Sequence, residues 1–93
     1  MFKYVVVVDS EDAKNHLKSL NKNTTKRATK LEKTAIAFLT ITELNRFVKL
    51  LSTPPISMFH LTDGEITKEF LENIKETAED EMLNQRLKKV TEA

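Results

Sequence analysis

The sequence predicts a small α/β domain in which three mainly parallel strands and three helices alternate as β-α-β-α-β-α, with helices on both faces of the sheet. Residues 4–8 favour strand structure without any alternation, which is typical of a strand buried on both faces. Two further apolar stretches, residues 34–39 and 56–61, are each followed by a helix-capping sequence. From residue 65 an amphipathic pattern then continues almost to the end of the chain.

The first helix is expected to begin at Asp9 and Ser10, because both residue types cap helix N-termini well. Glu11 and Asp12 add negative charge to its first turn, which the helix dipole favours. Apolar residues then recur at helical spacing as far as Leu20. This pattern predicts a helix that lies on the first strand.

The second and third strands share one strand-to-helix signal. Thr40 and Glu43 have the spacing of a capping box, and Thr62 with Glu65 repeats it. The second helix should end before Pro54, since proline lacks the N–H group that a helix requires. With residues 4–8 as the central strand, the other two strands are expected on either side of it. The two crossovers would then place the first two helices on opposite faces.

The last predicted helix, residues 65–92, is longer than the sheet needs. A helix of this length would measure roughly 35 to 40 Å, more than the width of so small a domain. Its outer apolar positions, Leu83, Leu87 and Val90, are therefore expected to mediate self-association. The alternative is a helix that breaks near Asp80 and folds back as a hairpin.

Composition limits the classes of function. The 93 residues make one domain, with a net charge of +1 and no cysteine, which excludes disulfides and thiolate metal sites. No signal peptide is evident, and no apolar run is long enough to span a bilayer. We therefore expect a soluble cytoplasmic protein that requires no membrane and no cofactor.

Charge is nevertheless segregated along the chain. The segment 22–33 has a net charge of +4, from five basic residues and one acidic residue. Its basic residues are Lys22, Lys26, Arg27, Lys30 and Lys33. The segment is interpreted as a loop or a short weak helix that binds nucleic-acid phosphate or an acidic protein surface. The other interpretation, which the sequence alone favours, is a solvated loop that balances the acidic last helix, where residues 65–81 carry a net charge of −5.

Catalytic chemistry has weaker support. Asp9 and Asp63 would lie at the carboxyl ends of parallel strands, where phosphate-handling enzymes place their ligands, but helix capping explains both residues. Gly64 alone cannot build a phosphate-binding loop. His16 and His60 have no spacing that suggests a metal site, so no catalytic or metal-binding residue is predicted.

Three hypotheses follow in order of preference. The first is a non-catalytic regulatory or interaction protein that binds another macromolecule, as a homodimer. The second is an RNA- or DNA-binding protein that uses the basic segment 22–33. The third is a phosphate-handling enzyme that uses Asp9 and Asp63.

Overall fold

The computed structural model describes residues 2–62, 64–77 and 87–89. The strands are β1 (Tyr4–Asp9), β2 (Thr25–Lys30), β3 (Lys33–Phe38), β4 (Ser57–Leu61) and β5 (Leu87–Lys89). The helices are α1 (Ser10–Lys14), a 3-10 turn η1 (Leu17–Ser19), α2 (Ile41–Val48) and α3 (Lys68–Thr77).

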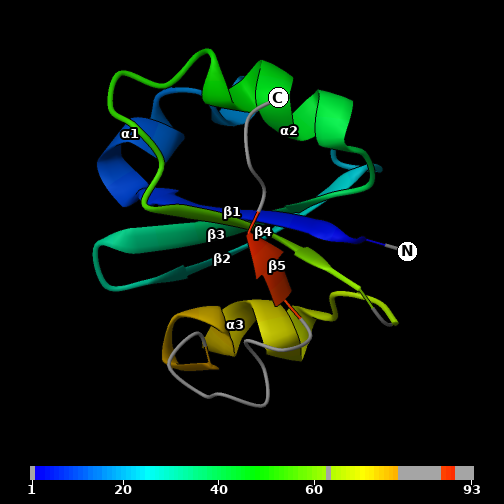
Figure 1. The fold of residues 1–93 in the computed structure, drawn as a ribbon. Coiled ribbons are helices and arrows are strands. Elements are labelled where there is room, and N and C mark those ends of the chain that lie inside the picture. Colours follow the sequence, from blue (N-terminus) through cyan, green and yellow to red (C-terminus); the bar gives the residue numbers. More distant parts are fainter. Residues whose placement is uncertain (1, 63, 78–86, 90–93) are drawn as a thin grey trace.

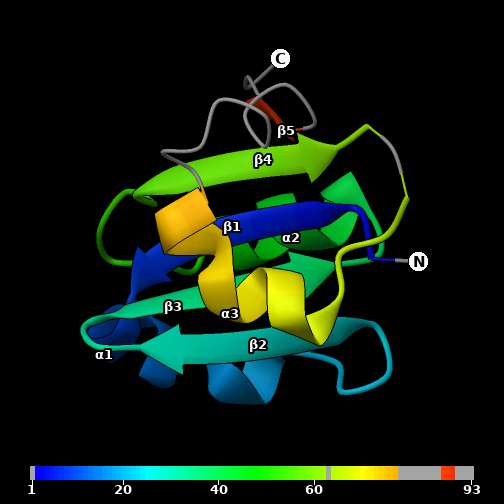
Figure 2. The same ribbon diagram turned by 90° about the horizontal axis from the view of Figure 1, so that it is seen from below.

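The strands form one antiparallel sheet in the order β2-β3-β1-β4-β5. From β1 to β4 the chain follows the order β-α-β-β-α-β, which is the split βαβ, or ferredoxin-like, topology. Helices α1 and α2 lie on one face of the sheet, and α3 covers the other face (Figures 1 and 2). The molecule thus has three layers.

Strand β1 is central because its side chains are buried on both faces. Val6 and Val8 pack in a cluster with Leu44 and Phe47 of α2, on the face that α1 and α2 cover. Val5 and Val7 pack on the other face in a cluster with Leu71 of α3. The unbroken valine run therefore supplies the core on both sides of the sheet.

The predicted parallel, three-stranded sheet is wrong. Residues 25–30, interpreted from the sequence as a loop or weak helix, form strand β2, which pairs with β3 in a hairpin. This additional strand reverses the chain direction, so β3 enters the sheet antiparallel to β1. Helix α2 then returns the chain to β4, which is also antiparallel to β1. β3 and β4 do flank β1, but α1 and α2 lie on the same face.

The predicted helix over residues 65–92 is also wrong. Helix α3 begins at Lys68, where the Thr67 hydroxyl accepts a hydrogen bond from the Phe70 N–H at 3.1 Å. Gly64, with a φ of 75°, turns the chain before this helix, and the Ile66 N–H then donates to the Phe2 carbonyl at 2.8 Å. Residues 87–89 form β5 on the edge of β4 instead of continuing a helix. The break suggested near Asp80 lies outside the described residues.

Two of the predicted helix caps are confirmed. The Asp9 carboxylate accepts hydrogen bonds from the N–H groups of Glu11 and Asp12, at 2.9 and 3.4 Å. The Thr40 hydroxyl accepts the Glu43 N–H at 3.2 Å, as the capping-box spacing predicts. These bonds satisfy N–H groups that have no partner within the helix.

Replacing Thr40 with alanine is expected to lower the free energy of unfolding by about 1 kcal/mol, because the first turn of α2 loses its cap. Urea unfolding followed by circular dichroism measures the loss. Thr42→Ala, at an exposed position within the same helix, is the control. Equal stability of the two variants would contradict the role of Thr40.

Candidate functional site

The most distinctive surface of the molecule is a groove between the α1–η1 segment and the edge strand β2. It consists of two adjoining cavities of about 560 and 300 Å³, which share Leu17 and Arg27 in their walls. Five basic residues line the two cavities: Lys14, Lys18, Lys22, Lys26 and Arg27. No aspartate or glutamate lines these two cavities, and we refer to them together as the basic groove. Glu43 lines a third cavity, which shares Leu20 and Thr25 with the larger one.

Hydroxyl groups alternate with the charges along the basic groove. Thr25 lines the larger cavity, while Ser10, Thr29 and Thr34 line the smaller one. The Thr34 hydroxyl oxygen lies 2.7 Å from that of Ser10 and 3.0 Å from that of Thr29. The Thr25 hydroxyl donates to the Asn21 carbonyl at 2.7 Å, and Thr34 is only 3% exposed. The donors that phosphate oxygens could accept are therefore mainly the cationic side chains.

The structure divides the predicted basic segment between the two faces of the sheet. Paired residues of an antiparallel sheet point to the same face, and Arg27 pairs with Ile36, which lies on the α1–α2 face. Lys30 instead pairs with Lys33, on the face that α3 covers. These two lysines line a shallow cavity together with Glu72 of α3. Part of the segment therefore lies near the acidic helix of the same molecule, which was the alternative interpretation.

Unlike Lys30 and Lys33, both Lys22 and Lys26 line the basic groove. Lys22 lines the larger cavity from the turn that precedes β2. Lys26 lines it as well, but its Nζ atom lies 4.9 Å from the centroid of the Phe2 ring, at the other face of the strand. Lys26 therefore contributes to the charge of the groove from its margin.

Sequence reasoning missed Lys14 and Lys18, which line the groove from α1 and η1. Their four-residue spacing would place them on one side of a helix, and this was the only available signal. Such pairs are common on solvated helix surfaces. Only the packing of η1 beside the edge strand joins them to Arg27.

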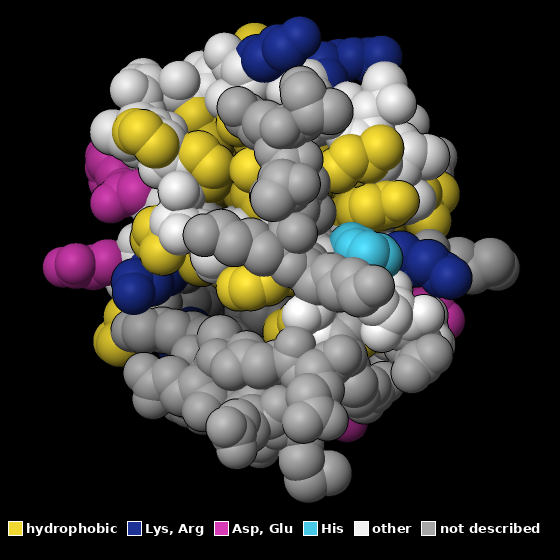
Figure 3. All heavy atoms as spheres, in the orientation of Figure 1, with side chains coloured by type: hydrophobic (Ala, Val, Ile, Leu, Met, Phe, Trp, Pro, Cys, Tyr) yellow, Lys and Arg dark blue, Asp and Glu magenta, His cyan; other side chains and the backbone are white. Residues whose placement is uncertain are grey.

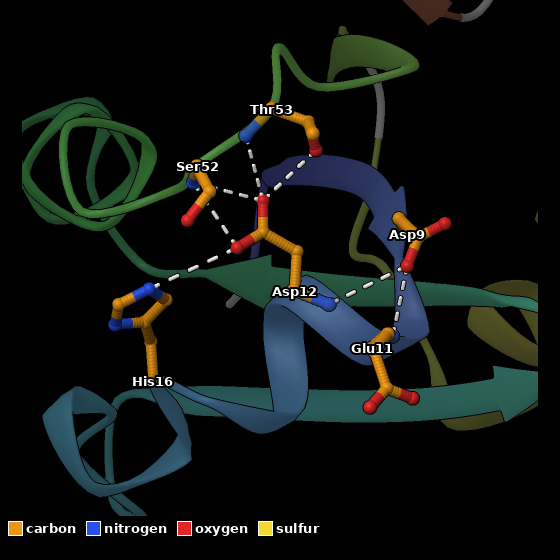
Figure 4. A network of polar contacts seen from close by, with 6 residues as sticks. All are labelled: Asp9, Glu11, Asp12, His16, Ser52 and Thr53. Atoms are coloured by element: carbon orange, nitrogen blue, oxygen red, sulfur yellow. Dashed lines mark hydrogen bonds and ion pairs between the residues drawn. The ribbon is translucent and has the colours of Figure 1, made fainter.

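Asp12 occupies a second polar site, between α1 and the loop that follows α2 (Figure 4). Its side chain is 7% exposed and accepts hydrogen bonds from the Ser52 N–H, the Thr53 N–H and the Thr53 hydroxyl, at 2.9 to 3.1 Å. His16 Nε2 lies 3.8 Å from its Oδ1 atom. The N–H groups of Ser52 and then of Thr53 lower the pKa of Asp12, because they stabilise the carboxylate.

This Asp12 site connects α1 to the loop that follows α2. The Thr53 hydroxyl donates to the carboxylate and not to His16, so the arrangement lacks a nucleophile activated by a base. The Asp12 site is therefore structural. From the sequence, Asp12 was expected only to place a favourable charge in the first turn of the helix.

The described residues do not test the enzyme hypothesis, which depends on Asp9 and Asp63. Asp9 caps α1, and Asp63 lies outside the described residues. His60 packs beside Tyr4, with 5.7 Å between the ring centroids. Among the residues that the structure describes, no cluster of three or more histidine, aspartate or glutamate side chains is arranged to hold a metal ion.

The predicted oligomer interface is only partly within the described chain. Leu87 is 6% exposed and packs in the core of its own molecule, while Leu83 and Val90 lie outside the described residues. The exposed edge of β2 is basic, so edge-to-edge pairing of two copies would bring like charges together. Self-association stays a prediction.

The opposite edge of the sheet, at β5, exposes hydrophobic side chains and not a cluster of basic ones (Figure 3). Figure 3 shows the side that carries β5, where hydrophobic side chains lie between scattered Lys and Arg side chains at the margins. Leu50 and Ile56, in the chain between α2 and β4, are 43% and 52% exposed. The clustered basic residues of the groove lie instead at the β2 edge.

Comparisons of the chain with known protein families, curated proteins and solved structures found no match. Within the part of the chain that the structure describes, no helix has both the length and the apolar character needed to cross a bilayer. The split βαβ topology does not by itself assign a function, so the functional assignment depends on the basic groove.

Proposed function

We propose that this protein is a non-catalytic nucleic-acid-binding protein that holds a phosphate backbone in the basic groove. The observation that supports this function is the groove itself, where four basic residues and no acidic residue line two adjoining cavities, with Lys26 at the margin. The net charge of the chain is only +1, so attraction to a polyanion must come from this local concentration of charge.

The shape of the groove suits an extended polyanion better than a single small anion. The groove follows β2, whose six residues extend about 20 Å, close to the rise of six base pairs of duplex. Of the threonines that line this path, Thr29 is exposed, whereas the Thr25 hydroxyl donates to the Asn21 carbonyl. Phosphate contacts would therefore come mainly from the cationic side chains.

The composition of the groove favours binding without sequence preference. Its apolar lining residues are Ala13, Leu17 and Leu20, and no aromatic side chain is present on which a base would stack. Affinity is therefore expected to come mainly from the release of counterions. Such binding weakens steeply as the salt concentration rises.

A variant with three groove residues neutralised, Lys18→Gln, Lys22→Gln and Arg27→Gln, tests the proposal. We expect its dissociation constant for a labelled oligonucleotide of about 20 residues to rise roughly 100-fold near 0.15 M salt. The slope of log K against log salt should fall by about 2 to 3, as each lost phosphate contact reduces it by about 0.7 to 0.9. Fluorescence anisotropy between about 50 and 200 mM salt measures both quantities.

The matched control neutralises three exposed lysines outside the groove, by Lys3→Gln, Lys49→Gln and Lys68→Gln. Both variants have the same net charge, so only the position of the charges differs. Equal weakening by the two variants, or no binding by the unaltered protein, would contradict the proposal. Complete displacement of the oligonucleotide by polyglutamate at equal charge would favour an acidic protein partner instead.

A further inference from the structure

The turn between β2 and β3 contains a residue that the fold does not require. Leu31 and Glu32 connect the two strands, and Leu31 has a φ of 59°. No other non-glycine residue in the described part of the chain has a positive φ. Two-residue turns of this kind usually have glycine at the first position, because a side chain there is strained.

The Leu31 side chain is also poorly placed for stability. It is 80% exposed, more than Leu50 at 43% or Ile56 at 52%. A glycine at this position would relieve the backbone and remove apolar surface from water. The leucine is thus unfavourable in backbone conformation, and it gains almost nothing from burial. Non-glycine residues held in such a backbone conformation cluster at functional sites, including ligand contacts.

Leu31 lies at the end of the basic groove. Thr29 and Thr34, which line the smaller cavity, pair with each other in the last part of the hairpin before the turn. The Ser10 N–H donates to the Glu32 carbonyl at 2.8 Å, so the turn is held against the first residue of α1. A nucleic-acid strand that follows the groove past these hydroxyl groups would reach Leu31 next.

We infer that Leu31 is an apolar contact to the bases of the nucleic acid, inserted beside or between them where the strand leaves the groove. Exposed leucine side chains can serve as wedges that partly unstack a base step. This inference rests on the proposed function. It identifies the ligand as a polynucleotide with accessible bases, because isolated phosphate groups would gain nothing from an apolar contact.

The variant Leu31→Gly distinguishes the contribution of Leu31 to binding from its effect on the stability of the fold. We expect the Tm of the variant to rise by roughly 2 to 8 °C, because the strain is relieved. Its dissociation constant for the oligonucleotide should rise roughly 10-fold, as expected when an apolar contact to a base is lost. The salt slope should stay unchanged, since no phosphate contact is removed. Leu31→Asn, which tolerates a positive φ and is polar, should weaken binding in the same way.

Ile56→Asn is the control, because it removes an exposed aliphatic side chain that lines neither cavity of the groove. An oligonucleotide with 2-aminopurine should brighten on binding the unaltered protein and less on binding Leu31→Gly, which reports unstacking directly. If the unaltered protein binds and both Leu31 variants bind equally well, the inference is overturned while the proposed function stands. If the unaltered protein does not bind, both fail together. A lower Tm for Leu31→Gly would overturn the argument that leucine is costly to the fold.

Discussion

Replacing Phe38 with alanine is expected to lower the free energy of unfolding by about 3 to 5 kcal/mol. Phe38 is 1% exposed, and its ring packs against that of Phe47 with 5.8 Å between centroids and 43° between planes. This contact joins β3 to α2, so its removal leaves a cavity between the sheet and the helix. Domains of this size have a total stability of roughly 5 to 15 kcal/mol, and the loss is a large part of it.

Urea unfolding followed by circular dichroism measures the effect. Leu50→Ala is the control, because this side chain is 43% exposed and lies just after the same helix. The control is expected to lose less than about 1 kcal/mol. If both variants lost the same free energy, Phe38 would not be the residue that holds α2 on the sheet.

Replacing Asp12 with asparagine is expected to lower the Tm at pH 7 by about 5 to 10 °C. Asparagine keeps the shape of the side chain but removes the charge, and one of its two oxygen acceptors becomes a donor. The N–H groups of Ser52 and Thr53, which both donate to the carboxylate, then have only one oxygen acceptor left. Helix α1 would be held less firmly against the loop after α2.

The loss of Tm in Asp12→Asn should become smaller at acid pH. Since the pKa of Asp12 in the folded protein lies below its usual value of 3.8, the unfolded chain binds the proton more tightly. The stability that the carboxylate contributes is therefore fully present above about pH 4 and is lost as pH falls through the folded pKa. The difference in Tm between the two proteins should accordingly shrink toward acid pH.

Calorimetry from about pH 7 to pH 3 tests this dependence. Glu11→Gln is the control, as it neutralises an exposed carboxylate on the same helix. A Tm difference for Asp12→Asn that stays constant over the whole range would show that charge is not the cause. A difference that grows as the pH falls from about 4 to 3 would reverse the sign of the linkage.

The hairpin illustrates why the sheet could not be predicted. Strand β2 alternates Thr25, Arg27 and Thr29 with two lysines and an alanine, so neither face has an apolar pattern. The turn that follows it has Leu31 in place of the glycine or asparagine that usually marks a hairpin. Missing this one strand reverses every later strand relative to β1, which is why the predicted strand directions were wrong although β3 and β4 do flank β1.

The prediction of one helix over residues 65–92 was wrong for a different reason. The recurrence of apolar residues from 65 onward agrees with helical spacing over α3, but three residues around Leu87 suit a strand equally well. Their pairing with β4 is a contact between residues far apart in the sequence. Local periodicity carries no information about such a contact.

The candidate site was predicted in part. Lys22 and Arg27 were recognised by their charge, and both line the basic groove. Lys30 and Lys33 belong to the same run of charge but face α3, because neighbouring residues of a strand point to opposite faces. Lys14 and Lys18 join the groove from a separate element, which no analysis of the segment 22–33 could include.

The sequence by itself determined that residues 4–8 form a doubly buried strand and that Asp9 and Thr40 begin helices. These features depend on residues that lie within a few positions of one another. Only the tertiary structure decided the direction of the strands, the face on which each helix packs, and the joining of cations from α1, η1 and β2 into one groove. Those outcomes depend on contacts between distant segments, whose free energy comes from burial and pairing across the whole sheet.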